Sequence, residues 1–163
     1  MKYAVHPIWM LLLGAILTGS WPGLARAAER TRITGLADAD FGQIVGTADR
    51  AITQSLCVYS SSPTGAYGVM ASGSGSGGSF ALSSGSAALP FEVLWADSPN
   101  QSSGTFLPPG TPRGGFSSNA SQHFCNSGPP STATLTIVIR SADLGNAQAG
   151  TYSGMLQIMI VPE

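Results

Sequence analysis

The chain has 163 residues, enough for one domain, and 43% of them are hydrophobic while only 9% are charged. Residues 28–163 contain five arginines and eight acidic residues, so their net charge is −3. The chain therefore lacks the cluster of basic residues that binds a nucleic acid backbone. Few charges, many small polar residues and β-branched runs are typical of a surface or extracellular β-protein and not of a cytosolic enzyme.

The N-terminus predicts a secretory signal peptide over residues 1–27. Lys2 precedes an apolar run at residues 8–17, and Ala25-Arg26-Ala27 fits an Ala-x-Ala cleavage site. The alternative is a membrane anchor, but about ten apolar residues fall short of the roughly 20 that a membrane-spanning helix needs. We therefore expect export, with residues 28–163 as the mature domain.

Short segments with alternating apolar and polar residues predict up to seven strands and no helix of ordinary length. One helical turn is expected at residues 142–145. The segment 97–131 reads as a long irregular connection, held to the body of the domain by Phe106-Leu107 and Phe124-Cys125. In chain order the predicted strands are 41–45, 51–59, 66–72, 79–82, 89–95, 132–140 and 152–161. Short strands with regular turn signals predict an all-β sandwich.

Two of these strands have pronounced apolar faces. In the strand 89–95, the residues Leu89, Phe91, Val93 and Trp95 share one face, which predicts a core position for Trp95 in preference to an exposed binding role. In the strand 132–140, the odd-numbered residues 133, 135, 137 and 139 are expected inward and the even-numbered residues from Thr132 to Arg140 outward.

The last predicted strand poses a question about its neighbours. Tyr152, Leu156, Ile158 and Ile160 lie on one face, and the sequence continues only to Pro162-Glu163 after it. A long apolar strand at this position is either packed inside a sheet or an edge that awaits a partner strand.

Two cysteines, Cys57 and Cys125, lie 68 positions apart. In an exported chain such a pair predicts one disulfide, which would stabilise the fold by roughly 4 kcal/mol through loop closure. A metal pair or a reactive thiol is the alternative, but no Cys-x-x-Cys motif or neighbouring histidine supports it.

The sequence offers no plausible set of catalytic partners, so we expect no enzyme, no cofactor and no metal. His123 is the one histidine after residue 27 and has no identifiable partner. Asp38, Asp40 and Asp49 could gather at one turn, but they lack the spacing of a calcium loop. The run 73–78 fits Gly-x-Gly-x-x-Gly and contains Gly-x-Ser-x-Gly, yet no helix is expected after it, which favours a flexible hairpin loop.

With the strands placed, several short motifs resemble one protein family. They are Asp40-Phe41-Gly42, Cys57 at the end of a strand, Ala66-Tyr67-Gly68-Val69, Leu89-Pro90-Phe91-Glu92-Val93 and Ala149-Gly150-Thr151-Tyr152-Ser153-Gly154-Met155-Leu156. Together they are similar to the spore coat protein U domain, the pilin domain of archaic chaperone–usher pili, over most of residues 40–163.

The resemblance implies an immunoglobulin-like sandwich that lacks its last strand. A periplasmic chaperone would lend this strand, and in the fibre the N-terminal extension of a neighbouring subunit would replace it, with an outer-membrane usher as a further partner. The protein would be secreted through the periplasm to the cell surface, as a fimbrial subunit serving adhesion and biofilm formation. The implied walls of the strand-acceptor groove are Phe41 and Ile44 on one side and Tyr152, Leu156, Ile158 and Ile160 on the other.

The segment before Asp40 departs from the family pattern. It is polar, and Ile33 and Leu36 make a poor donor strand, which suits a minor or tip-proximal subunit better than a repeating shaft subunit. The alternative function is a self-contained exported β-sandwich that binds a surface sugar or protein through residues 97–131.

Overall fold

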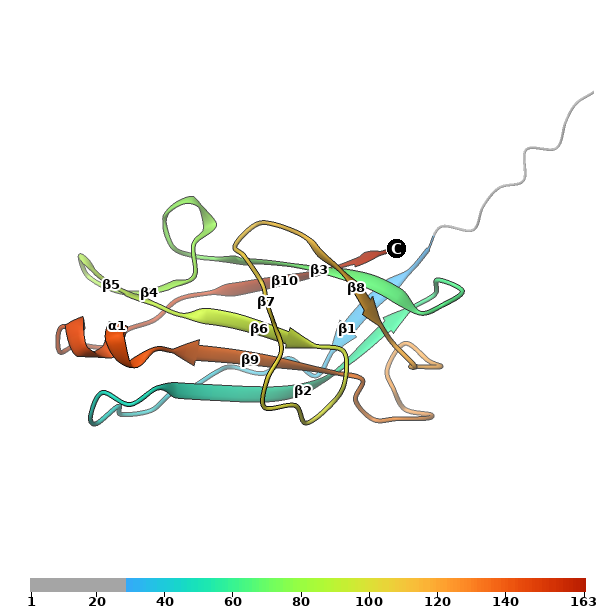
Figure 1. Cartoon of the computed structure of the whole chain (residues 1–163), viewed down its shortest axis with the longest axis horizontal. Coiled ribbons are helices and arrows are strands. Elements are labelled where there is room, and N and C mark those ends of the chain that lie inside the picture. Colours follow the sequence, from blue (N-terminus) through green and yellow to red (C-terminus); the bar gives the residue numbers. More distant parts are fainter. Residues whose placement is uncertain (1–28) are drawn as a thin grey trace, which may run out of the picture.

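The computed structural model describes residues 29–163, so the predicted signal peptide lies outside the described residues. Their fold is an immunoglobulin-like β-sandwich, as predicted, and Figure 1 shows its strands running along the long axis. No helix in the described part of the chain is long and apolar enough to span a membrane. The elements are β1 (Thr31–Thr34), β2 (Arg50–Ser60), β3 (Ala66–Gly73), a 3-10 turn (Ser76–Gly78), β4 (Ala81–Ser84), β5 (Ala87–Pro90), β6 (Glu92–Ala96), β7 (Thr105–Phe106), β8 (Arg113–Ser117), β9 (Ala133–Ile139), α1 (Ser141–Asn146) and β10 (Leu156–Pro162).

Two antiparallel sheets form the layers of the sandwich. One has the strand order β1-β2-β9-β6-β7, and the other has the order β10-β3-β8, while β4 and β5 form a separate pair. In the second sheet, β10 lies at the edge and pairs with β3 over seven residues, from Leu156 opposite Gly73 to Pro162 opposite Tyr67. The sheet order therefore leaves the outer side of β10 without a neighbouring strand among the described residues.

The core between the sheets centres on aromatic side chains. Trp95 and Tyr67 are fully buried, and the Trp95 Nε1–H donates a hydrogen bond to the Tyr67 hydroxyl at 3.2 Å. The Phe116 ring lies 5.8 Å from the Tyr67 ring. This arrangement confirms the predicted core position of Trp95, whose indole N–H finds the partner that a buried donor needs.

We expect the replacement Tyr67→Phe to lower the free energy of unfolding by about 1–3 kcal/mol, because it leaves the buried Trp95 N–H without an acceptor. Burial raises the pKa of Tyr67 to about 12. The unfolded chain therefore loses this proton first, and the stability linked to Tyr67 is present below about pH 10 and lost as the pH rises through 12. Urea unfolding followed by Trp95 fluorescence should show this alkaline loss in the wild type. A loss of the same size between pH 10 and 12 in Tyr67→Phe would contradict the assignment.

Several predicted strands are wrong in their bounds or existence. Residues 41–45 form no strand, because Gly42 and Gly46 both take positive φ angles (59° and 85°) that interrupt an extended chain. The last strand begins at Leu156 and not at residue 152. The prediction missed β1 and also β7 and β8 inside the segment 97–131, and the predicted strand 89–95 is divided into β5 and β6. The described residues therefore hold ten strands and not seven.

The strand β9 is buried on both faces and not on one. The hydroxyl of Thr134 donates to the Ser98 carbonyl at 2.7 Å and accepts from the Gln101 N–H at 3.2 Å. Ser98 and Gln101, which follow β6, thus cover Thr134 on the outer face of β9. The predicted outward position of Thr132, Thr134, Thr136 and Val138 is wrong, because all four are buried. Threonine hydroxyls on this face suit burial because each finds a polar partner.

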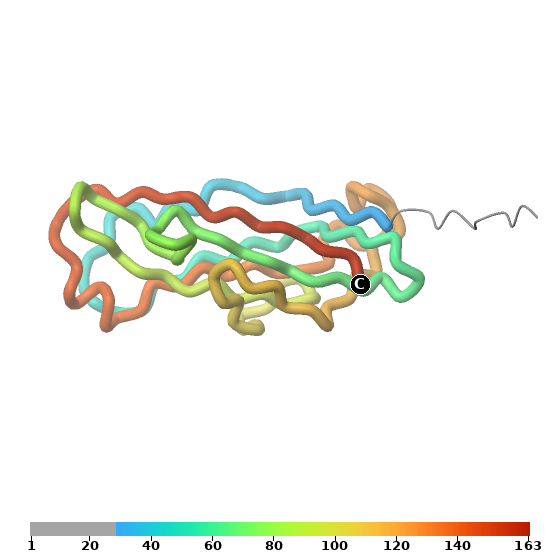
Figure 2. The backbone as a smooth tube through the Cα atoms, turned by 90° about the horizontal axis from the view of Figure 1, so that it is seen from above, coloured from blue at the N-terminus to red at the C-terminus, as the bar shows by residue number. Residues whose placement is uncertain are grey.

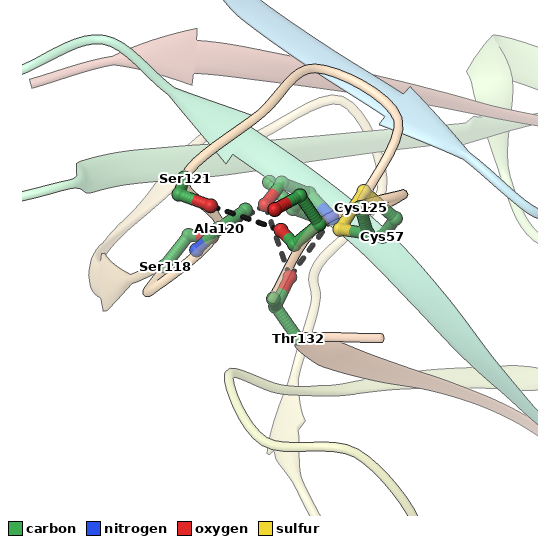
Figure 3. Close-up of a disulfide and its surroundings, with 8 residues drawn as sticks. Cys57, Ser118, Ala120, Ser121, Cys125 and Thr132 are labelled. Atoms are coloured by element: carbon green, nitrogen blue, oxygen red, sulfur yellow. Dashed lines mark hydrogen bonds between the residues drawn. A yellow bond between two sulfur atoms is a disulfide. The ribbon is translucent and has the colours of Figure 1, made fainter. Parts of the chain in front are cut away.

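The disulfide between Cys57 and Cys125 is present, as predicted, with its Cα atoms 5.9 Å apart (Figure 3). It joins β2 to the loop that precedes β9. Beside it, the hydroxyls of Thr132 and Ser118 both donate to the Val58 carbonyl, which fixes the two ends of this loop on β2. Of the predicted attachment points of the irregular segment, Leu107 and Cys125 are buried, whereas the side chains of Phe106 and Phe124 are 45% and 56% exposed.

Candidate strand-acceptor groove

A groove of about 1110 Å³ runs along the sandwich between β10 and the segment 36–46. Figure 2 shows that both parts of the chain run along the long axis, in opposite chain directions. The floor consists of core side chains from the strands between them, Leu89, Phe91, Leu135, Ile137 and Ile139. The groove therefore gives access to the hydrophobic interior of the sandwich, where a neighbouring strand would otherwise lie.

The first wall of the groove is the free edge of β10. Met155 accepts a hydrogen bond from the Ser74 N–H at 3.0 Å, and hydrogen-bonded residues recur at every second position of an antiparallel ladder. The backbone groups of Leu156, Ile158 and Ile160 consequently point away from β3, toward the groove. The N–H and C=O groups of Leu156 and Ile158 can form a ladder with an added strand.

The side chains of the same residues lie on the core side of β10. Leu156, Ile158 and Ile160 pack against the hydrophobic core, but each remains only half-buried. On the other face of the strand, Met155 and Met159 are 64% and 55% exposed. An added strand would thus cover the first set of side chains and leave the methionines in solvent.

The second wall is the irregular segment that carries Phe41 and Ile44. Both side chains are half-buried against the core. Two hydrogen bonds between Ala37 and Gln54 fix the segment to β2. The Ala37 N–H donates to Gln54 Oε1 at 3.1 Å, and Gln54 Nε2 donates to the Ala37 carbonyl at 2.9 Å. The segment stands beside the sandwich without backbone pairing to β10, which keeps the groove open.

The groove is bounded differently at its two ends. At one end the Thr31 hydroxyl of β1 donates to the Ile160 carbonyl at 3.0 Å, so β1 closes the space beside the last part of β10. At the other end lies α1, whose first residue, Ser141, donates its N–H to Asp49 at 2.7 Å. This bond, together with the guanidinium of Arg140 at 3.0 Å, lowers the pKa of Asp49.

The structure brings most of the predicted groove residues together. Phe41, Ile44, Tyr152, Leu156 and Ile158 line the groove, and Ile160 packs on the same core beside the closed end. The prediction did not include the floor residues of β5 and β9, Phe91 between β5 and β6, or Leu82 and Leu144 near the α1 end. The alternation of the floor strands in the sequence carried the signal for the floor, because their apolar faces must meet the inner face of β10.

The residues considered for catalysis or metal binding do not assemble into such a site. His123 is exposed and stacks on Tyr59 with ring centroids 4.4 Å apart. Asp49 binds Arg140 and Ser141, while Asp40 accepts the Gly42 N–H at 2.8 Å, so these aspartates serve separate local contacts. Within residues 29–163, no group of three or more His, Cys, Asp or Glu side chains could hold a metal ion.

A second, smaller pocket of about 220 Å³ lies where the segment 97–131 meets the sandwich. Its lining is mostly polar and includes Asp97, Ser98, Asn119 and Ser131. The carboxylate of Asp97 already accepts the Ser117 N–H at 3.2 Å. This pocket is where the alternative function, recognition of a surface sugar or protein, would have its site.

No protein-family model and no curated protein matches the sequence. Among solved structures, the fold is similar to that of a chain in a chaperone–tip adhesin complex of CFA/I fimbriae biogenesis, with a TM-score of 0.54 and 16% sequence identity. The match covers 82% of this chain and 41% of that one, so the present chain spans less than half the length of its structural neighbour. At this identity the likeness shows a shared fold, and the fold is one found in a fimbrial assembly complex.

Proposed function

We propose that this protein is a structural subunit of a chaperone–usher type pilus or surface fibre, assembled by donor-strand complementation. The observation that carries the proposal is the free edge of β10 beside an open groove whose floor is the core itself. The backbone groups and the half-buried side chains of Leu156 and Ile158 both face this space.

An inserted strand would gain affinity from two sources. Its backbone would pair with the free edge of β10, and its alternate side chains would bury the remaining surface of Leu156 and Ile158. Completing the burial of a partly exposed aliphatic side chain contributes up to about 1 kcal/mol, so these two residues contribute up to roughly 2 kcal/mol before the backbone bonds are added. Until a strand is inserted, the free edge and this surface favour aggregation.

The resemblance to the spore coat protein U domain and the fold shared with a chain of a fimbrial chaperone–adhesin complex support the same proposal. Its partners would be a periplasmic pilus chaperone, an outer-membrane usher and neighbouring subunits. The subunit would be secreted through the periplasm to the cell surface, where it would serve adhesion and biofilm formation in a minor or tip-proximal position. The role is structural and not enzymatic.

The test is to express the full chain in a periplasm, alone and together with a periplasmic pilus chaperone from the same organism. We expect most of the chain expressed alone to be degraded or aggregated, with a minor soluble fraction that serves for measurements on the free chain, and a one-to-one complex on size-exclusion chromatography when the chaperone is present. A soluble monomer with a cooperative thermal transition and no dependence on the chaperone would contradict the proposal.

The polar pocket at Asp97 favours a second candidate, a self-contained binding module. In that case the purified monomer should bind a surface glycan or protein, and Asn119→Ala should weaken this binding while Ile158→Asp leaves it unchanged. The two candidates therefore predict opposite sensitivities of binding to substitutions in the groove and in the pocket.

A further inference from the structure

The groove between β10 and the segment 36–46 has charge on one wall only. Of the side chains that line it, those of Asp38 and Asp40 are the only charged ones in the described part of the chain, and both are exposed at the rim. Neither Asp38 nor Asp40 forms an ion pair within residues 29–163. Asp40 uses one carboxylate oxygen to accept the Gly42 N–H. Arg50, which follows this wall, uses its guanidinium on the Val45 carbonyl at 2.9 Å.

The other wall and the floor carry no charge. The lining residues from Ala147 to Ile158 are all uncharged, and the floor residues are apolar. A strand lying in the groove would send every second side chain to the floor and the intervening side chains outward, past the rim. Those intervening side chains would thus come alongside a rim that bears two negative charges and no positive charge.

We propose that the groove selects an extended segment of a different polypeptide, with bulky apolar side chains at alternate positions and lysine or arginine at the intervening positions beside Asp38 and Asp40. This inference rests on the proposed function, because it specifies the strand that the groove accepts. A second copy of this chain fits less well. Its residues 29–40 contain Arg30 and Arg32, but Ile33 and Leu36 are three positions apart and would point to opposite faces of a strand.

The two aspartates would act mainly on the choice of partner and on the rate of association. An exposed ion pair changes a binding constant by a factor of about 1.5 to 5, and a like-charge contact has a similar effect in the opposite direction. For two rim positions, a basic strand should bind about tenfold more tightly than an acidic one at low ionic strength. Salt should reduce this ratio, because the charges are open to solvent.

The experiment uses the full chain and a labelled synthetic strand of alternating valine and threonine, with fluorescence anisotropy as the readout. Two central threonines are replaced by lysine in one peptide and by glutamate in another. At about 0.01 M salt, where the Debye length is about 30 Å, we expect the tenfold preference for the lysine peptide, and at about 1 M a preference below twofold. The double variant Asp38→Asn, Asp40→Asn should reduce the low-salt preference to about twofold. Asparagine keeps the side-chain oxygen that accepts the Gly42 N–H.

Glu29→Gln is the control, because Glu29 precedes β1 and does not line the groove. This substitution removes one negative charge outside the groove and should leave the preference for the lysine peptide unchanged. Equal binding of the lysine and glutamate peptides, or a preference that survives in the double variant, overturns the inference and leaves the proposed function standing. Binding of a peptide of residues 29–40 as tight as that of the lysine peptide overturns the choice of a different polypeptide. If none of the peptides binds and none competes with a pilus chaperone, the proposed function itself fails.

Discussion

Replacing Ile158 by aspartate is expected to abolish the complex with a strand-donating partner, with a loss of affinity of more than about a hundredfold. In the free chain the side chain at position 158 faces the open groove, so a carboxylate there remains hydrated and the fold persists. Insertion of a strand would bury this carboxylate against Phe91 and Ile137 without a partner, at a cost of several kcal/mol.

Met159→Asp is the matched control for this prediction. It introduces the same charge one residue further along the same strand, but the Met159 side chain is 55% exposed on the opposite face of β10. The affinity should therefore stay within about threefold of the wild-type value, as is usual for exposed positions. Both variants are compared by co-purification with the chaperone and by Trp95 fluorescence to verify folding. If the two substitutions weaken the complex equally while both chains remain folded, the assignment of the inner face of β10 is wrong.

Removal of the disulfide should produce the largest loss of stability. The double variant Cys57→Ala, Cys125→Ala opens a loop of 68 positions, for which the loss of chain-entropy stabilisation is about 4 kcal/mol. Urea unfolding followed by fluorescence measures this loss, since Trp95 is the one tryptophan after residue 27 and is fully buried.

The wild type under reducing conditions is the control for the double variant, and the two should unfold at the same urea concentration. The loop next to β9 depends on this link, because the remaining contacts of Cys125 and its neighbours are hydrogen bonds and two exposed rings. His123 stacks on Tyr59, and Phe124 lies under the Arg32 guanidinium at 3.8 Å. A loss below about 1 kcal/mol would show that these contacts hold the loop without the disulfide.

Strands with strong alternation were predictable from the sequence. The pattern in β6 and β9 placed Trp95 and Leu135 correctly in the core, because a half-buried strand must separate apolar from polar residues. The cysteine pair was predictable from the export signal and the even number of cysteines.

Other parts of the fold depend on tertiary contacts that alternation does not report. The strand β1 is polar in sequence and forms because its backbone pairs with β2, from Thr31 opposite Ser60 to Thr34 opposite Cys57. The burial of Thr134 depends on a loop that is distant in sequence. The segment 41–45 looks like a strand by its apolar residues, but its glycines take conformations that an extended chain excludes.

The groove was predictable in part for a related reason. An apolar face on the last strand indicates which side chains need cover, but the sequence pattern does not show which element stands opposite. The wall at Phe41 and Ile44 was expected to be a strand with its own ladder, and it is instead an irregular segment fixed through Gln54. The resulting space is bounded by β1 beside Ile160 and by Leu144 of α1 toward the other end.

Residue-resolved hydrogen exchange of β10 tests the acceptance of a strand most directly. In the free chain, the amides of Gln157, Met159 and Val161 bond to β3 and should exchange slowly, whereas those of Leu156 and Ile158 face the groove and should exchange fast. In the complex with a chaperone or a donor peptide, we expect the amide exchange of Leu156 and Ile158 to slow by at least about tenfold. The exchange rates of Gln157, Met159 and Val161 should change little. Unchanged fast exchange at Leu156 and Ile158 in a complex of proven stoichiometry would contradict the account, because the partner would then bind elsewhere.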